Sequence, residues 1–439
     1  MSVAACDSDA DESTSPISCE VLPNMRVLGR RHVRPLEALA FACFLALFSV
    51  SVVWYGLSRD HRIRPSTSPN DVATPATWRQ GDPTTRAIWR QHEAPQHVHA
   101  DDAANTTAVA LSMRNVVFLK MVKCASSSVQ NVLMRYGYAH NLTFALPRTG
   151  WHFGFRRFNP KRALRPPGGV FNMFCHHARF DYALVARMMP ADSVYVSIVR
   201  QPGTMFESLY TYLQYERETG ATYEEFVREP RRYYRADRQQ RVLARNPMSY
   251  LFGLEPEDFD RPSATTAFLA DVRRRFDYVM IYERFDESLV LLRALLGWAW
   301  RDVIVFRVNS RRASARTQNG DELRRLAEAW NDADARLYDA FLDDFRRRVE
   351  AYGADRMASD VTRLRSMRER RYGQCVAGMA EVAPLPGLSY RLRAGADAGC
   401  GRLVRSEPAF TEDIKHKLWP DVEFIDVIKR YYMKSNETT

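Results

Sequence analysis

Two lysines and three serines gather in one short segment, residues 120–128, which has the sequence KMVKCASSS. Small side chains let the main chain approach a ligand, and a helix that begins there presents unpaired N–H groups and the positive end of its dipole. The serine hydroxyls donate further hydrogen bonds, and Lys123 adds a mobile charge. The segment lacks the GxxxxGK[ST] pattern of a nucleotide triphosphate loop. It predicts either an anion-binding loop or an ordinary Ser-rich helix cap with a solvated lysine.

A second pair of polar residues lies further along the chain. Arg200 directly follows the apolar run SVYVSIV at residues 193–199, and Ser208 lies eight residues later. A guanidinium at the end of a strand and a hydroxyl two turns into the next helix can converge on a phosphate group. Taken alone, Arg200 would more often form a structural ion pair. Both segments in this order are a more specific signal, and they indicate two neighbouring anion subsites.

Two adjacent histidines, His176 and His177, are the candidates for proton transfer. Imidazole titrates near neutrality, which suits the deprotonation of a hydroxyl group during nucleophilic attack. By residue type alone, such a pair is more often a surface pair or a hydrogen-bonded pair in the core. The residues themselves leave both interpretations open.

The predicted secondary structure around these residues alternates between strands and helices. Apolar runs typical of buried strands occur at residues 116–120, 193–199 and 277–282. Helical patterns follow at residues 129–136, 204–214 and 283–296, and helical spacing of apolar residues extends over 321–350. This alternation predicts an α/β fold with a mostly parallel sheet flanked by helices.

The N-terminal part predicts a membrane anchor. Twenty uncharged positions follow Glu37 in the run at residues 36–57, enough for one transmembrane helix. The run is too long, and starts too far into the chain, for a typical cleaved signal peptide. Three glycosylation sequons follow it, at Asn105, Asn141 and Asn436. We therefore expect a type II membrane protein with a cytoplasmic tail (1–35), a signal-anchor (36–57), a stem (58–110) and a lumenal domain (111–439).

The net charge of +11 predicts an anionic partner. Residues 1–57 hold four Arg and six acidic residues, so the positive excess belongs to the rest of the chain. Charge alone does not distinguish nucleic acid, a membrane surface, a sulfated glycan or a nucleotide. A nucleic-acid partner is not expected, because the sequence shows no nucleic-acid-binding motif and the predicted location is lumenal.

Four of the seven cysteines follow the predicted anchor: Cys124, Cys175, Cys375 and Cys400. No pair has the spacing of zinc ligands, so no metal site is expected. Cys375 and Cys400 are the pair predicted to form a disulfide.

These segments resemble the galactose-3-O-sulfotransferase family of Golgi carbohydrate sulfotransferases. The resemblance covers roughly residues 115–350 and rests on VVFLKMVKCASSSVQNVLMRYGYAHNLTFALP, FNMFCHHARF, MMPADSVYVSIVRQPGTMFESLYTYL and FDYVMIYERFDESLVLLRALLGWAWRDVIVFRVN. It implies a P-loop-like sulfotransferase fold and a Golgi membrane location. It also implies transfer of a sulfuryl group from 3′-phosphoadenosine-5′-phosphosulfate (PAPS) to the 3-hydroxyl of a terminal β-galactose, on a glycolipid or a glycoprotein. The sequence is compatible with a homodimer.

The resemblance further implies roles for individual residues. It assigns the 5′-phosphosulfate of the donor to Lys120, Lys123, Cys124, Ala125, Ser126, Ser127 and Ser128, and the 3′-phosphate to Arg200 and Ser208. Lys123 would stabilise the charge that develops on the bridging oxygen as the bond to sulfur breaks. His177 stands at the position of a family histidine, and is favoured over His176 as the general base.

Two residues depart from the usual family loop, Thr-His-Lys-Thr-Gly-Ser-Ser-Thr. Val122 replaces the histidine, and Ala125 replaces the glycine. The second change is tolerated only where the backbone angles suit a Cβ atom. These departures leave two alternatives open: transfer to another sugar hydroxyl, and a catalytically inactive lumenal glycan-binding protein.

Overall fold

The computed structural model describes residues 113–235, 241–306, 320–381 and 388–422, all within the compact unit Ala76–Thr439. The predicted tail, signal-anchor and stem lie outside the described residues, as do the sequons at Asn105 and Asn436. Among the residues that are described, none of the helices combines the length and the apolar character needed to cross a membrane.

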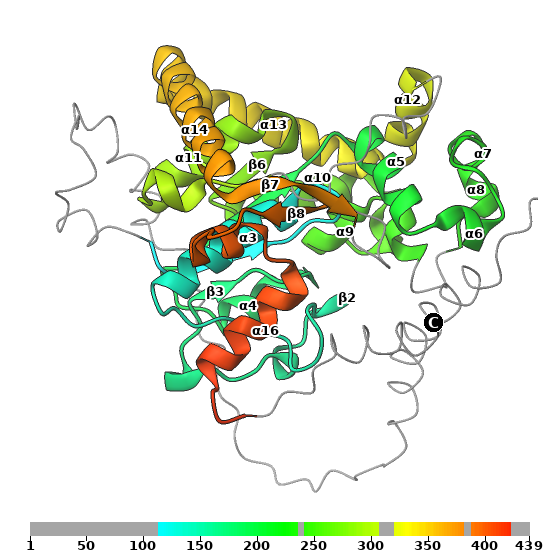
Figure 1. Cartoon of the computed structure of the whole chain (residues 1–439). Coiled ribbons are helices and arrows are strands. Elements are labelled where there is room, and N and C mark those ends of the chain that lie inside the picture. The colour runs from blue at the N-terminus through cyan, green and yellow to red at the C-terminus, as the bar shows by residue number, and fades with distance from the viewer. Residues whose placement is uncertain (1–112, 236–240, 307–319, 382–387, 423–439) are drawn as a thin grey trace, which may run out of the picture. The chain divides into compact units, whose positions relative to one another are not determined.

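Four parallel strands form the central sheet, in the order β3-β1-β5-β6. Their bounds are Val116–Leu119 (β1), Met173–Phe174 (β3), Val194–Val199 (β5) and Tyr278–Ile281 (β6). All their residues are buried, as expected for parallel strands covered on both faces. The three apolar runs of the sequence correspond to β1, β5 and β6. The prediction of an α/β fold with a parallel sheet flanked by helices is therefore confirmed (Figure 1).

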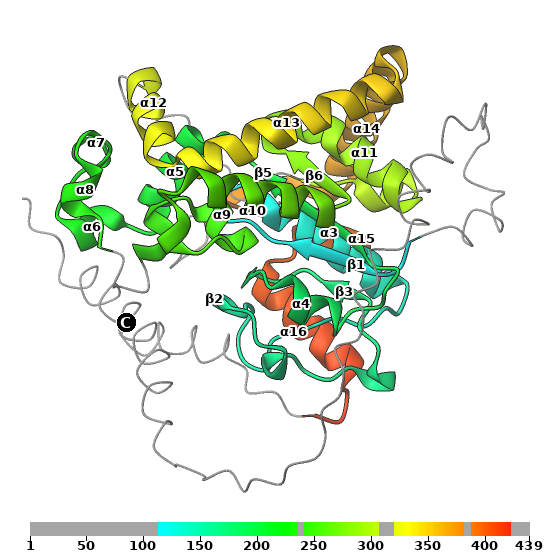
Figure 2. The same cartoon turned by 180° about the vertical axis from the view of Figure 1, so that it is seen from behind.

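Helices cover both faces of this sheet. α3 (Ser126–Ala139) lies in front of β1 in Figure 1, whereas α10 (Pro262–Arg275) and α13 (Asp332–Tyr352) come to the front in Figure 2. The other helices of eight or more residues are α5 (Pro202–Tyr212), α11 (Phe285–Leu296), α12 (Gly320–Trp330), α14 (Ala354–Cys375) and α16 (Glu407–Leu418) among the described residues. The shorter helices are α4 (Tyr182–Ala186), α6 (Tyr215–Thr219), α7 (Tyr223–Arg228), α8 (Pro230–Tyr233), α9 (Pro247–Phe252) and α15 (Ala398–Val404).

Two further pairs of strands lie outside the central sheet. β2 (Gly154–Arg157) pairs in parallel with β4 (Ala178–Arg179), and β7 (Val376–Glu381) pairs antiparallel with β8 (Leu388–Leu392). The remaining elements are 3₁₀ turns at Pro160–Arg162, Pro167–Gly169, Arg241–Ala244, Pro256–Asp258, Tyr282–Arg284 and Trp300–Val303.

The helical pattern at residues 321–350 forms two helices, α12 and α13, instead of one. Asn331 separates them with non-helical backbone angles (φ −109°, ψ 49°). Its side chain is completely buried and accepts a hydrogen bond from the main-chain N–H of Asn246 at 2.7 Å. The Asn331 side chain thus provides an acceptor for the buried N–H of Asn246, in the loop before α9. A polar side chain that bonds to the main chain in this way favours a break between α12 and α13.

The predicted disulfide between Cys375 and Cys400 is confirmed. It joins the end of α14 to α15 and encloses the β7–β8 pair. The C-terminal elements then pack on α3: the Asn131 side chain donates to the Arg402 carbonyl at 3.0 Å, and the ring of Phe410 on α16 meets Tyr138 edge to face at 5.9 Å. This packing places α16 beside the first strand–loop–helix unit (Figure 1).

Candidate active site

The register of the parallel strands brings the candidate residues to one edge of the sheet. Val117 on β1 is paired with Phe174 on β3. The residues three positions later, Lys120 and His177, therefore lie at the same level beyond the ends of the two strands. Leu119 is likewise paired with Ser197 on β5, which places Arg200 beside the loop after β1. The carboxyl edge of parallel strands is where α/β proteins usually bind ligands.

The loop after β1 has an unusual backbone. Lys123 (φ 55°) and Ala125 (φ 57°) both adopt the left-handed conformation, which costs a residue with a Cβ atom about 1 kcal/mol or more. Ala125 is the N-cap of α3, and its side chain provides no hydrogen bond to the helix. The replacement of glycine by alanine therefore falls at a position where glycine is the better fit.

Four main-chain carbonyl groups of this loop contact side chains of the protein, and that of Val122 accepts from the Cys124 thiol at 3.2 Å. The Lys120 carbonyl contacts His177 Nδ1 at 3.0 Å, that of Met121 accepts from Ser126 Oγ, and that of Lys123 accepts from Arg200 Nη1 at 3.0 Å. Carbonyl oxygens repel an anion, so an arrangement that occupies them with donors suits a loop that binds one.

Besides the buried Lys120, two cations lie at the strand ends, Lys123 and Arg200. Both are partly exposed. The ammonium group of Lys123 lies 3.9 Å from the ring centre of Tyr212, and the guanidinium of Arg200 lies 4.4 Å from that of Tyr282. Arg200 Nε also donates to Thr204 Oγ1 at 3.1 Å. Arg200 thus holds the loop of Lys123 and keeps part of its charge available to a ligand.

The other residues predicted to bind the donor differ in their solvent exposure. Ser126 and Ser128 are buried and Ser127 is partly exposed, all in the first turn of α3. Cys124 is buried, with its thiol at 3.2 Å from the Val122 carbonyl, and burial raises its pKa. Only the main chain of Cys124 is therefore suited to contact an anion. Ser208 is buried in α5, where Thr204 and not Ser208 bonds Arg200.

His177 is oriented as a general base would be. Its Nδ1 lies 3.0 Å from the Lys120 carbonyl oxygen, which can only accept, so Nδ1 carries the proton and Nε2 keeps its lone pair. Burial, and then the charge of Lys120, lower the pKa of His177 to about 3. The ring therefore stays neutral throughout the physiological range, with a free lone pair on Nε2, and it is a weaker base than an ordinary imidazole.

His176 has a different environment. It is completely buried, and its Nε2 lies 3.0 Å from Thr411 Oγ1. The Thr411 hydroxyl itself donates to the Glu407 carbonyl at 2.7 Å, so it accepts the proton of His176 Nε2. These contacts tie His176 to α16, and the geometry favours His177 over His176 as the base.

Lys120 is completely buried and makes contacts that the sequence did not reveal. Its ammonium group forms an ion pair with Glu407 and donates to Gln130 Oε1 at 2.7 Å. Glu407 begins α16, 287 residues further along the chain, and lacks any neighbouring motif that would have marked it. Tyr212 and Tyr282 were also missed, because single aromatic residues give no signal of their own.

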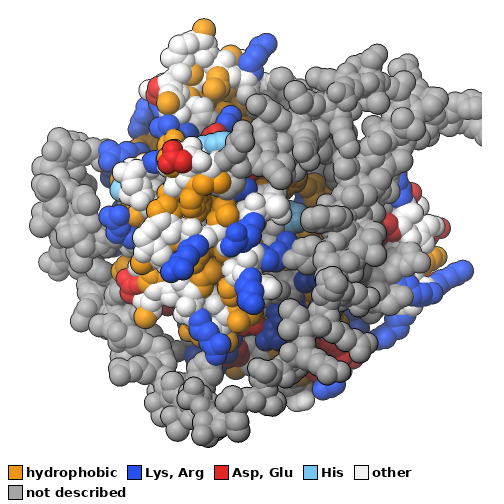
Figure 3. Space-filling model, turned by 90° about the horizontal axis from the view of Figure 1, so that it is seen from below, with side chains coloured by type: hydrophobic (Ala, Val, Ile, Leu, Met, Phe, Trp, Pro, Cys, Tyr) orange, Lys and Arg blue, Asp and Glu red, His pale blue; other side chains and the backbone are white. Residues whose placement is uncertain are grey.

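The surroundings of this site are basic. The segment from Arg114 to Phe180, which supplies β1 to β4, contains neither Asp nor Glu. On the face seen from below, Lys and Arg side chains stand among hydrophobic ones over the part that is described (Figure 3). Such a field attracts anionic ligands to the sheet edge.

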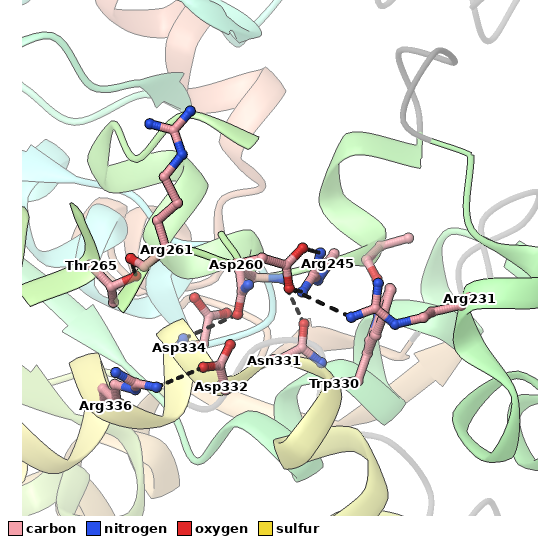
Figure 4. Close-up of polar contacts among 12 residues, drawn as sticks. Arg231, Arg245, Asp260, Arg261, Thr265, Trp330, Asn331, Asp332, Asp334 and Arg336 are labelled. Carbon is pink, nitrogen blue, oxygen red and sulfur yellow. Dashed lines mark hydrogen bonds and ion pairs between the residues drawn. The ribbon is translucent and has the colours of Figure 1, made fainter. Parts of the chain in front are cut away.

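A second polar cluster lines a cavity of about 440 Å³ between α8, α12 and α13. Its arginines are already paired with carboxylates (Figure 4): Arg245 with Asp260 at 2.8 Å, Arg231 with Asp260 at 3.6 Å, and Arg336 with Asp332 at 3.1 Å. This pairing neutralises much of the cavity's charge. The strand ends are therefore the better site for a multiply charged anion.

Within the described residues, no three His, Cys, Asp or Glu side chains are grouped as metal ligands would be. In that part of the chain the strand-end site contains cations, main-chain groups, an imidazole and the Glu407 carboxylate that pairs with Lys120. The cations, main-chain groups and imidazole bind an anion and accept a proton, as group transfer to a hydroxyl requires.

Comparison with known proteins agrees with this class of site. Residues 42–385 match the family described as galactose-3-O-sulfotransferase, and the chain belongs to that family. It is 36% identical over 294 residues to galactosylceramide sulfotransferase of Bos taurus, covering 65% of this chain and 70% of the relative. It is 41% identical over 285 residues to galactose-3-O-sulfotransferase 3 of Mus musculus, covering 61% and 65%. Galactose-3-O-sulfotransferase 2 of Homo sapiens is 35% identical over 326 residues, covering 67% and 81%.

Proposed function

We propose that this chain transfers a sulfuryl group from PAPS to the 3-hydroxyl of a terminal β-galactose. The observation that carries the proposal is the meeting of Lys123, Arg200 and His177 at the carboxyl edge of one parallel sheet, through the two hydrogen bonds to the loop carbonyls. The family and the names of the relatives support the same reaction.

The residues present fit a donor with phosphate groups at both ends. The loop of residues 120–128 would hold the 5′-phosphosulfate with main-chain N–H groups, serine hydroxyls and Lys123. Arg200 would hold the 3′-phosphate, because a guanidinium matches a phosphate with two hydrogen bonds. When bound, the donor supplies an activated sulfuryl group.

Transfer then requires a general base and a group that stabilises negative charge. His177 Nε2 accepts the proton of the galactose hydroxyl as its oxygen attacks sulfur. Lys123 stabilises the negative charge on the bridging oxygen of the bond that breaks, and 3′,5′-bisphosphoadenosine leaves. His177 can serve as the base here, although Val122 replaces the histidine of the usual family loop.

The location is part of the proposal. A Golgi type II orientation, with residues 111–439 in the lumen, fits the disulfide and the exposed side chain of Asn141. Galactose-bearing glycolipids and glycoproteins are both candidate acceptors, and the relatives include an enzyme named for galactosylceramide. Removal of N-glycans from the full-length chain should increase its electrophoretic mobility; an unchanged mobility would argue against lumenal exposure.

The full-length chain, labelled PAPS and a panel of galactose-terminated glycolipids and glycans test the reaction. We expect label on the galactose 3-hydroxyl, and a loss of at least about a hundredfold in Lys123→Ala. Lys161→Ala, which changes an exposed lysine of a 3₁₀ turn, should keep its activity. Label on another hydroxyl would favour the first alternative. Donor and glycan binding without transfer would favour the inactive binding protein.

A further inference from the structure

α16 takes part in the strand-end site although it lies beyond residues 42–385, the part of the chain that matches the family. Its first residue, Glu407, forms the ion pair with Lys120. The Gln130 side chain of α3 bridges the two, donating to Glu407 Oε1 at 3.0 Å and accepting from Lys120 at 2.7 Å. A carboxylate, an amide and an ammonium group thus form a closed set of contacts behind the loop.

The electrostatics explain what this carboxylate does. Burial lowers the pKa of Lys120, and Glu407 is the main group that opposes this shift. Burial alone would raise the pKa of Glu407, but the charge of Lys120 and its hydrogen bond to the carboxylate are among the causes that lower it below its usual value. Glu407 is thus ionised, and its charge favours the ammonium form of Lys120.

The other titratable groups near Lys120 do not replace that charge. Burial raises the pKa of the Cys175 thiol and lowers those of His152, His176 and His177. All four groups are therefore neutral at physiological pH. Lys415, which lies on α16 near His176, is itself a cation.

We propose that Glu407 is a positioning residue that keeps the buried Lys120 side chain charged and in place for the 5′-phosphosulfate of the donor. The inference rests on the proposed function, since it assumes that the loop binds that donor. Glu407 and Gln130 bind the ammonium group of the completely buried Lys120 behind the loop, so Lys120 would act on the ligand through its charge and through the loop that it supports. The C-terminal helix is then part of the donor site.

Calorimetric titration of the full-length chain with PAPS and with 3′,5′-bisphosphoadenosine tests this role without relying on turnover. Glu407→Gln should weaken PAPS binding by roughly thirtyfold, the lower end of the loss when one partner of a buried charge pair is removed. The deficit should be larger at about pH 8 than at about pH 6, because Lys120 without Glu407 regains its proton only as the pH falls. Asp413→Asn, which changes a residue of α16 and removes its exposed ion pair with Arg405 at the end of α15, should bind PAPS normally.

An exchange of the two neighbours separates charge from packing. The double variant Gln130→Glu/Glu407→Gln moves the carboxylate to the other side of Lys120 and preserves the sizes of both side chains. We expect it to regain most of the PAPS affinity and the shallow pH dependence of the wild type. The same variant keeps the inference testable if Glu407→Gln alone fails to fold.

The outcomes separate the two proposals. Normal affinity and normal pH dependence in Glu407→Gln, or a folded double variant that binds as poorly as Glu407→Gln, would overturn the inference and leave the proposed function intact. A wild-type chain that binds neither nucleotide would refute both.

Discussion

The loop after β1 and the loop after β5 are both proposed to bind the donor, but they differ in backbone conformation. The β1 loop has two left-handed residues that are not glycine, Lys123 and Ala125, and its helix starts without a side-chain cap. The β5 loop is relaxed: Gln201 caps α5 by accepting from the Thr204 N–H at 2.8 Å, and Pro202 occupies the first turn. In the proposed site, the strain lies where the main chain would face the donor, and an ordinary helix start occurs where the long side chain of Arg200 would do so.

The two loops are also joined by a hydrogen bond. Arg200, at the start of the β5 loop, donates this bond to the Lys123 carbonyl of the β1 loop. The unstrained β5 loop therefore helps to hold the strained β1 loop in place. We expect changes at Lys123, in the loop after β1, and at His177, which follows β3 and contacts that loop, to act mainly on kcat. Changes on the β5 side should act mainly on the KM for the donor.

The largest effect is expected at His177. His177→Gln can keep an N–H donor for the Lys120 carbonyl but cannot accept a proton, so kcat should fall by about a hundredfold to ten-thousandfold with little change in donor KM. His140→Gln is the matched control, because His140 is exposed and its Nδ1 also contacts a carbonyl, that of Tyr136 at 2.9 Å. Equal kcat values for wild type and His177→Gln would remove this residue from the mechanism.

The pH profile sharpens the same prediction. Because its pKa is lowered to about 3, His177 is neutral above that pH, and kcat should not fall on its account between about pH 7 and pH 5. The unfolded chain has an ordinary histidine, which binds a proton below about pH 6.5. The folded state therefore loses stability as the pH falls from about 6.5 towards 3, and His177→Gln should reduce that loss in acid denaturation.

An intermediate effect is expected at Arg200. Lysine cannot reproduce both the bond to the Lys123 carbonyl and the planar contact with Tyr282. Arg200→Lys should therefore raise the donor KM by roughly tenfold to a hundredfold and reduce kcat less. Arg231→Lys, at an exposed arginine 3.6 Å from Asp260, serves as the control. A change confined to kcat would contradict the division of tasks between the loops.

The smallest effect is expected at Ala125. Ala125→Gly relieves the left-handed strain but loosens the unfolded chain, so the free energy of unfolding should rise by about 0.5 kcal/mol. Ala163→Gly, at a buried residue with ordinary angles (φ −80°, ψ 141°), should instead lower it by about 0.5–1 kcal/mol. Urea denaturation measures both. A loss of stability in Ala125→Gly would mean that the loop is not strained there.

Most of the sheet could be predicted from the sequence because β1, β5 and β6 are continuous apolar runs. β3 could not, since two residues are too few to show a period. The lysines and serines of the loop were visible because they are close in sequence, as was the cysteine pair that forms the disulfide. Glu407 was not, because its partner Lys120 is 287 residues away and only folding brings them together. The turn at Asn331 depends on a contact with Asn246, which periodicity does not record.

The pairing of Phe174 with Val117 has a consequence for insertions. A single residue added just after Phe174 would move His176, and not His177, to the level of Lys120. Two adjacent histidines therefore make this edge tolerant of a shift by one residue: an imidazole would still stand beside the loop, although it would give up its bond to Thr411. Among the described residues at the strand ends, the proposed base thus has a neighbour of its own kind.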